Sequence, residues 1–134
     1  MAAASQVTWL MAILRDTVVG LAREDGRDLT ARQLGVLLVC YLEYGPLTVR
    51  GLAVRLNTPK PSICRAIDRL VSLNLASRGG DPRDRRSILV TRTAAGTSYM
   101  IALRDLMLAA ARGPNLGDER LLPWTAWSSP ACPA

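Results

Sequence analysis

The segment from Gly80 to Ser87 constrains this chain more than any other stretch. It reads Gly-Asp-Pro-Arg-Asp-Arg-Arg-Ser and lies between two short runs typical of β-strands. A helix-like pattern with outward arginines comes directly before it. A hairpin with a cationic tip beside such a helix is suited to contacting two grooves of one DNA duplex. A salt-bridged surface turn that never meets DNA is the alternative interpretation.

The size and composition of the chain favour a helical core. A length of 134 residues fits one compact domain, or one domain with a helical arm. The hydrophobic share of 49% suffices for a core, which argues against wholesale disorder. Because phenylalanine is absent and aromatic residues make up 4%, aliphatic side chains must fill the interior. We therefore expect helices packed on helices.

Positive charge is concentrated in the second third of the chain. The net charge is +6, yet the segment from Thr48 to Arg92 alone holds ten Lys or Arg residues against three acids. The remainder is close to neutral. A basic segment on an otherwise balanced protein indicates a polyanion-binding surface, with a generic basic surface as the alternative.

Several classes of site are disfavoured by the residues that the sequence lacks. The absence of histidine removes His-based catalysis and nearly all zinc sites. Cys40, Cys64 and Cys132 show no CxxC spacing, which speaks against a metal knuckle or a disulfide framework. We expect no metal, no cofactor and no enzymatic activity. With no signal pattern and no apolar run of membrane-spanning length, we expect a cytoplasmic protein without a membrane partner.

Apolar periodicity predicts helices in the first third of the chain. Apolar residues recur at three- and four-residue steps from Val7 to Ala22, which predicts an amphipathic helix ending near residues 25–26. Thr30 is placed to cap a second helix. The buried stripe expected on this second helix consists of Leu34, Leu37, Leu38, Tyr41 and Leu42.

Two further helices are predicted in the basic segment. Thr48 is expected to cap a short third helix that runs to Leu56. After a tight turn, Thr58 is expected to cap a fourth helix, with Pro59 at its first position and an end near Leu73. The inward residues expected are Leu52, Ala53 and Leu56 on the third helix, and Ile63, Ala66, Ile67 and Leu70 on the fourth.

The rest of the pattern predicts a wing and a final long helix. Residues 75–78 and 87–91 are expected to form a two-stranded wing around the charged tip. Thr93 is expected to cap a fifth helix that ends at Gly113. The predicted fold class is mainly α with a small β-wing, a winged helix-turn-helix domain flanked by N- and C-terminal helices.

This order of elements resembles the MarR family of winged-helix transcription factors. The resemblance covers about residues 29–96. It is carried by Leu29-Thr30-Ala31-Arg32-Gln33, by Leu52-Ala53 with Leu56, by the run Ser62 to Leu70, and by Asp81-Pro82-Arg83-Asp84-Arg85-Arg86 followed by Thr93-Ala94-Ala95-Gly96.

The resemblance implies a domain organisation and a function. Residues 29–93 would form the DNA-binding domain, and residues 1–28 and 94–134 would form the dimerisation arm. The expected function is a sequence-specific transcriptional repressor that binds a pseudo-palindromic operator in double-stranded DNA as a homodimer. The resemblance also allows a small-molecule effector, with Trp9, Tyr41 and Tyr44 as residues that could line a pocket or simply fill the core.

The resemblance implies that the fourth helix lies in the major groove. Arg65 is expected to contact guanine, with Lys60 and Ser62 beside it on the outward face. Phosphate contacts are expected for Thr58 and Ser62. For Arg69 a phosphate contact and an intramolecular pair with Asp68 or a wing acid are both open.

At the wing, the resemblance implies that Asp84 orients Arg86 for the minor groove, where a narrow A·T-rich groove attracts cations. Arg83 and Arg85 would then contact phosphates. Which arginine enters the groove stays open between Arg85 and Arg86. The dimer seam residues expected are Val7, Leu10, Leu14, Tyr99, Leu103 and Leu106, all of which would equally serve in a single-chain core.

One alternative function uses the same fold. A winged-helix protein-interaction module that has lost operator binding would dock a partner through the apolar arm or the Trp-containing tail. The joint presence of Arg65 and the wing arginines favours DNA binding, because a pure interaction module does not need both.

Overall fold

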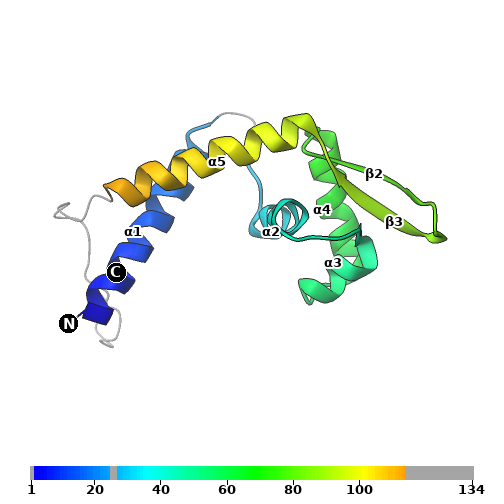
Figure 1. The fold of residues 1–134 in the computed structure, drawn as a ribbon, viewed down its shortest axis with the longest axis horizontal. Helices are drawn as coiled ribbons and strands as arrows, with labels where there is room; N and C mark the ends of the chain where they lie inside the picture. Colours follow the sequence, from blue (N-terminus) through cyan, green and yellow to red (C-terminus); the bar gives the residue numbers. More distant parts are fainter. Residues whose placement is uncertain (1, 25–26, 114–134) are drawn as a thin grey trace. The chain divides into compact units, whose positions relative to one another are not determined.

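The computed structural model describes residues 2–24 and 27–113, with side chains from residue 6 onward. The described part contains five helices and a three-stranded sheet (Figure 1), which confirms the predicted mainly α fold with a β-wing. It forms two compact units, Gly26–Ala102 and the described parts of Met1–Asp25 with Leu103–Ala134. The elements are α1 (Ala2–Ala22), α2 (Ala31–Leu42), β1 (Leu47–Thr48), α3 (Val49–Arg55), α4 (Lys60–Ser72), β2 (Ala76–Asp81), β3 (Asp84–Arg92) and α5 (Ala94–Arg112).

Helix α2 begins with the predicted cap. The Thr30 hydroxyl accepts a hydrogen bond from the backbone N–H of Gln33, and the Gln33 side chain accepts one from the backbone N–H of Thr30. This reciprocal capping box contributes about 1 kcal/mol to helix stability. The predicted stripe is partly wrong, because the helix is turned so that its buried residues are Val36, Leu37 and Cys40, while Leu42 is exposed.

The turn from α3 into α4 differs from the prediction at one cap. Thr48 caps α3 as expected, since its hydroxyl accepts from the N–H of Gly51 at 2.9 Å. The prediction that Thr58 caps α4 is wrong. Its hydroxyl instead donates to the carbonyl of Leu56 at 3.0 Å, and Pro59 takes the cap position without a side-chain bond. Asn57 adopts the left-handed φ of 48° that lets the chain reverse between the helices.

Helix α4 is the centre of the Gly26–Ala102 unit. Its inward residues Ile63, Ala66, Ile67 and Leu70 are all buried, as predicted. They pack against α2 and α3, which lie beside α4 in Figure 1. Burying a side chain of leucine or isoleucine contributes about 1.5–3 kcal/mol. The core that holds α4 therefore fixes which of its residues face outward.

The sheet has one strand more than predicted. Its order is β1-β3-β2, with Leu47 opposite Val90 and Ala76 opposite Arg92. The two wing strands also run further toward the tip than expected and leave only Pro82 and Arg83 between them. We call β2, β3 and this two-residue turn the wing. It projects from the α3–α4 pair in Figure 1.

The root of the wing is tied to α2 and to the start of α5 by Tyr41. Its hydroxyl lies 2.9 Å from the carbonyl of Leu75 and 3.2 Å from that of Thr93, and it accepts from the N–H of Thr93 at 3.0 Å. Thr93 caps α5 as predicted, accepting from the N–H of Gly96 at 2.9 Å. A Cβ atom at Gly96 would lie 1.8 Å from the Tyr41 hydroxyl, so only glycine fits there.

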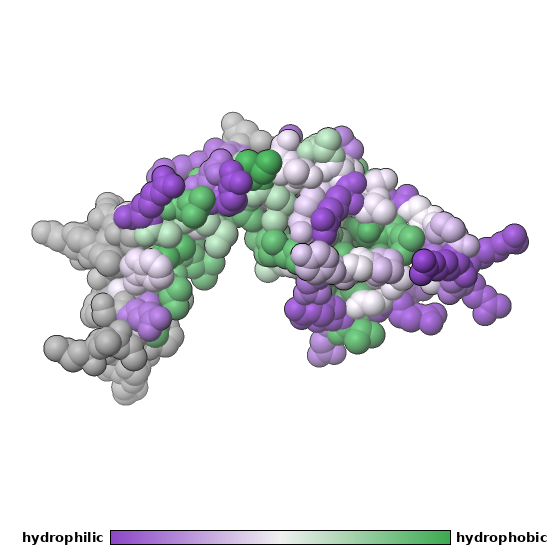
Figure 2. Space-filling model, viewed as in Figure 1, coloured by the Kyte–Doolittle hydropathy of each residue, from purple (hydrophilic) through white to green (hydrophobic). Residues whose placement is uncertain are grey.

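In the other unit, α1 packs against the second half of α5. A Cβ atom at Gly20 would lie 2.9 Å from a methyl group of Leu106, which shows how closely the two helices approach. Ala12 and Thr17 are buried, whereas Leu10, Leu14 and Val18 are 50–56% exposed. These three residues are four apart and share one face of α1. Part of this apolar surface is visible as green atoms in Figure 2.

Candidate nucleic-acid interface

The outward face of α4 carries the predicted polar residues. Lys60, Arg65 and Arg69 are exposed, and Ser62 is half-buried. The guanidinium of Arg65 donates to the Ser62 hydroxyl at 3.1 Å, one helical turn earlier. The two side chains therefore lie together near the start of α4. The hydroxyl of Thr58 donates to the carbonyl of Leu56, and Thr58 lines a shallow hollow together with Lys60.

The wing turn is built by two acids. Asp81 accepts a hydrogen bond of 2.8 Å from the backbone N–H of Arg83. Asp84 accepts one of 3.0 Å from the backbone N–H of Arg86 and another of 3.0 Å from the Ser87 hydroxyl. Short acidic side chains that bond the backbone two residues on are typical of tight turns. The turn therefore holds its shape through carboxylates rather than through arginine side chains.

These bonds show that Asp84 interacts with the backbone of Arg86, whereas the prediction was that it orients the Arg86 side chain. The backbone N–H of Arg86 and then the Ser87 hydroxyl stabilise the charged carboxylate and hold the pKa of Asp84 below its ordinary value, with a smaller contribution from the positive charge of Arg50. The acid contacts the backbone of Arg86, not its guanidinium. Asp84 thus positions the turn, and the exposed guanidinium of Arg86 is left available.

Helix α4 and the wing are joined by an ion pair. Asp68 on α4 pairs with Arg78 on β2, and α4 packs against β2. Asp68 is therefore the partner of Arg78, so the pair between Asp68 and Arg69 left open by the sequence does not form. An exposed pair of this kind contributes about 0–1 kcal/mol. It adds one contact between two elements, α4 and β2, that already pack against each other.

The ten basic residues from Thr48 to Arg92 fall into two groups. Arg55 pairs with Glu43 at 2.9 Å, Arg78 pairs with Asp68, and Arg92 donates to the carbonyls of Cys40 and Glu43 while it stacks over Tyr41. The other group forms no ion pair within residues 27–113 and lies on α3, α4 and the wing. It consists of Arg50, Lys60, Arg65, Arg69, Arg83, Arg85 and Arg86. Hydrophilic side chains of the wing are visible as the purple projections at the right of Figure 2.

Arg50 is the member of this group that the sequence patterns did not single out. It is exposed and is the second residue of α3. Its position two residues after the cap Thr48, inside the basic segment, was the available signal. Base-reading side chains lie on the second helix of a helix-turn-helix unit. A residue on the first helix is therefore not predicted to contact DNA by that pattern.

The candidate seam residues divide by exposure. Leu10 and Leu14 are 52% and 56% exposed, whereas Tyr99 and Leu103 are buried within the chain. Val7 and Leu106 are half-buried. Among these six candidates, the exposed apolar surface is therefore on α1. Of the aromatic residues considered for an effector pocket, Tyr41 is bonded at the wing root, Tyr44 is fully exposed and Trp9 is exposed.

Two other kinds of site are missing from the described residues. Within residues 2–24 and 27–113, no three His, Cys, Asp or Glu side chains gather closely enough to hold a metal ion. No helix in the same ranges combines the length and the apolar character needed to cross a membrane.

Comparison with known proteins supports the architecture. The crystal structure of the transcriptional regulator Tm0710 from Thermotoga maritima is similar at 22% identity and a TM-score of 0.63, over 77% of this chain and 69% of that one. The YusO protein from Bacillus subtilis is similar at 23% identity and a TM-score of 0.65, over 81% and 74%. Wild-type MarR from E. coli in its apo form is similar at 23% identity and a TM-score of 0.60, over 84% and 76%.

The sequence itself points the same way over the helix-turn-helix and the wing. No curated protein is significantly similar to the chain. Residues 27–87, however, match the MarR family, from the approach to α2 through the wing turn. Over these residues the chain is similar to the MarR family, and its described fold is that of the regulator structures to which it is similar.

Proposed function

We propose that the chain is a sequence-specific regulator of transcription that binds double-stranded DNA as a homodimer and acts as a repressor in the cytoplasm. One observation carries the proposal. The unpaired cations of α4 and of the wing belong to a single unit, and the Asp68–Arg78 pair joins the two elements that carry them. This arrangement lets a helix and a hairpin contact neighbouring grooves of one duplex.

In the proposed complex, the first turns of α4 enter the major groove. Arg65 donates two parallel hydrogen bonds to a guanine, which is worth about 1–3 kcal/mol of discrimination against other bases. Its present bond to the Ser62 hydroxyl is a neutral-acceptor contact on an exposed face, so exchanging it for guanine costs little. Ser62 is then free to contact a flanking phosphate. Arg69, one turn further along, contacts the backbone.

The wing supplies the second contact. A narrow minor groove concentrates negative potential and attracts arginine side chains. The turn that Asp81 and Asp84 hold in shape presents its arginines as exposed, unpaired side chains. The glycines beside the turn, Gly79 and Gly80, add no bulk, and a Cβ atom at either would meet nothing within 4 Å. The wing is therefore thin as well as cationic.

The exposed stripe Leu10, Leu14 and Val18 on α1 supports the homodimer part of the proposal. Contiguous exposed apolar side chains of this kind are typical of protein interfaces. A two-fold dimer would place two α4 helices on two half-sites, so the operator would be a pseudo-palindrome.

The proposal is tested by selecting duplexes from a random pool with the purified full-length protein and by footprinting genomic DNA. We expect a selected pseudo-palindrome. Replacing Arg65 with alanine should relax base preference at one position of each half-site. Replacing Arg83 with alanine should weaken binding to all sequences alike and lower the slope of log affinity against log salt by about 1.

Arg104 provides the matched control. It is an exposed arginine on α5 that pairs with Asp105 at 3.0 Å, so its replacement by alanine also removes one positive charge. We expect this variant to keep the selected sequence and the salt slope. Failure of the wild-type protein to enrich any duplex would overturn the proposal.

A further inference from the structure

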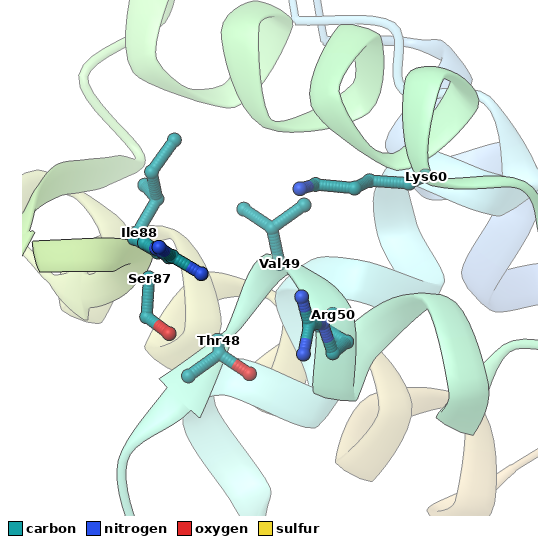
Figure 3. A pocket seen from close by; sticks show the side chains of 7 residues that line it. Thr48, Val49, Arg50, Lys60, Ser87 and Ile88 are labelled. Atoms are coloured by element: carbon teal, nitrogen blue, oxygen red, sulfur yellow. The ribbon is translucent and has the colours of Figure 1, made fainter. Parts of the chain in front are cut away.

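A small surface hollow lies where three elements of the Gly26–Ala102 unit meet. It is open to solvent, and its volume of about 20 Å³ is room for about one water molecule. Its polar lining comes from the start of α3 (Thr48 and Arg50), the start of α4 (Lys60) and β3 (Arg86 and Ser87). In Figure 3 the end of Lys60 lies above the Val49 side chain and the end of Arg50 lies below it, so the two cations flank Val49.

The two hydroxyl groups that line this hollow form hydrogen bonds within the protein, whereas the cations that line it form no ion pair within residues 27–113. The Thr48 hydroxyl accepts from the N–H of Gly51, and the Ser87 hydroxyl donates to Asp84. Arg50, Lys60 and Arg86 form no ion pair within residues 27–113. Three unpaired positive charges from three separate elements repel one another where they converge. A bound anion would relieve this repulsion and accept hydrogen bonds from these cations.

The nearest acid does not fill this role. The carboxylate of Asp84 accepts from the backbone N–H of Arg86 and from the Ser87 hydroxyl, and it forms no ion pair with Arg50. It shapes the strand that lines the hollow and leaves the cations open to a ligand. A tetrahedral oxyanion suits this geometry, because its oxygens can accept from guanidinium and ammonium groups that approach from different sides.

We infer that one backbone phosphodiester of the bound duplex lies across the mouth of this hollow, held jointly by Arg50, Lys60 and Arg86. The inference rests on the proposed function and deepens it. A sugar-phosphate strand separates the major groove from the neighbouring minor groove. The hollow lies between the start of α4 and the wing, which is where that strand must pass if each element enters its own groove.

This assignment changes the roles of two residues. Lys60 and Arg86 become anchors on the phosphate that fix the register of the protein on DNA. Arg85 at the wing turn is then the side chain that reaches the minor groove, and Arg83 keeps its phosphate contact. Arg50, on α3, joins the interface as a third anchor.

The test uses the selected duplex with single neutral methylphosphonate linkages placed at each position in turn. In the wild-type complex, one linkage per half-site should stand out with a loss of affinity of about tenfold. With Arg50→Gln, the unmodified duplex should bind about tenfold more weakly, and the same linkage should then have little further effect. Arg55→Gln is the control, since it removes a charge from the same helix at a residue paired with Glu43.

Each outcome of this test decides between possibilities. The phosphate site is overturned if Arg50→Gln still loses about tenfold in affinity when the sensitive linkage is neutral. It is also overturned if Arg55→Gln removes this loss as Arg50→Gln does. In either case the proposal of DNA binding stands. If no duplex binds the wild-type protein, both proposals fail. In a further arm, inorganic phosphate is added at constant ionic strength, and saturable competition at millimolar concentration would reassign the hollow to a soluble phosphate. Thermal unfolding of both variants should match the wild type.

Discussion

The hydroxyl of Tyr41 accepts a hydrogen bond of 3.0 Å from the backbone N–H of Thr93, fifty-two residues later in the chain. The same hydroxyl reaches the carbonyl of Leu75, so one oxygen joins the end of α2, the start of the wing and the start of α5. The guanidinium of Arg92 lies over the Tyr41 ring, 5.7 Å from its centre, and covers this junction. The position of the wing therefore depends on a side chain outside it.

Replacing Tyr41 with phenylalanine should lower the free energy of unfolding by about 1–3 kcal/mol, because it leaves the N–H of Thr93 and the carbonyl of Leu75 without their partner. Chemical denaturation measures this loss. Tyr44→Phe is the control, since the Tyr44 side chain is fully exposed and its hydroxyl should contribute nothing. Gly96→Ala should destabilise by a similar amount or more, because its Cβ atom would displace the Tyr41 hydroxyl. Equal stability of the two Tyr variants would show that the junction does not contribute.

The carboxyl of Asp84 should titrate below the ordinary value of an aspartate, as followed by NMR of its side-chain carbon. The backbone N–H of Arg86 and the Ser87 hydroxyl lower this pKa in the folded protein. A group with a lowered folded pKa stabilises at pH values above its unfolded pKa, and this contribution is lost as the pH falls through the folded pKa. The wing turn should therefore loosen only in acid, which exchange of the Arg86 amide would report.

Ser87→Ala provides a graded variant for this prediction. It removes one of the two hydrogen bonds to the Asp84 carboxylate and keeps the other. The pKa of Asp84 should then rise toward its ordinary value while remaining below it. An unchanged titration would show that the hydroxyl does not contribute.

Replacing Leu14 with aspartate should convert the proposed dimer into monomers in sedimentation experiments. Leu14 is at the centre of the exposed stripe on α1, and a charge there would be desolvated on association. Leu42→Asp is the matched control, because Leu42 is 69% exposed on α2, outside that stripe. A dimer that survives Leu14→Asp unchanged would remove α1 from the interface.

Cys40 should resist alkylation by iodoacetamide at pH 8 in the folded protein. Burial raises the pKa of this thiol to about 11, although the positive charge of Arg92 partly opposes the shift. Only about one thiol in a thousand is then the reactive thiolate at pH 8. Peptide mass mapping should find Cys40 modified only after denaturation. Rapid modification of the native protein would show that the side chain is accessible.

Local signals explain what was predictable from sequence. The caps at Thr30, Thr48 and Thr93 each depend on a hydrogen bond to a residue three positions later, so the necessary residues are adjacent in the chain. The buried face of α4 follows from helical periodicity in the same way.

Features that depend on distant parts of the chain were missed. Strand β1 has only two residues and exists because Leu47 pairs with Val90. The rotation of α2 that buries Cys40 and exposes Leu42 depends on the α4 surface against which it packs. The cap at Thr58 failed for a local reason, since its hydroxyl had a competing acceptor in the carbonyl of Leu56.

In the candidate interface, too, features set by the local sequence were predictable and features set by contacts between distant segments were not. Outward residues of α4 and the wing could be named from sequence, because they follow from periodicity and from a turn rich in arginine. Their partners could not. The pairing of Asp68 with Arg78 requires α4 and β2 to lie side by side, and the convergence of Arg50 with Lys60 and Arg86 requires three elements to meet.

The two acids of the wing turn bond only to backbone N–H groups and to one serine hydroxyl. The bend is consequently independent of which side chains stand at positions 83, 85 and 86. Evolution can exchange those side chains one at a time while the loop keeps its course. Related proteins could therefore acquire new target preferences through single substitutions at these three positions, and each intermediate protein would still fold.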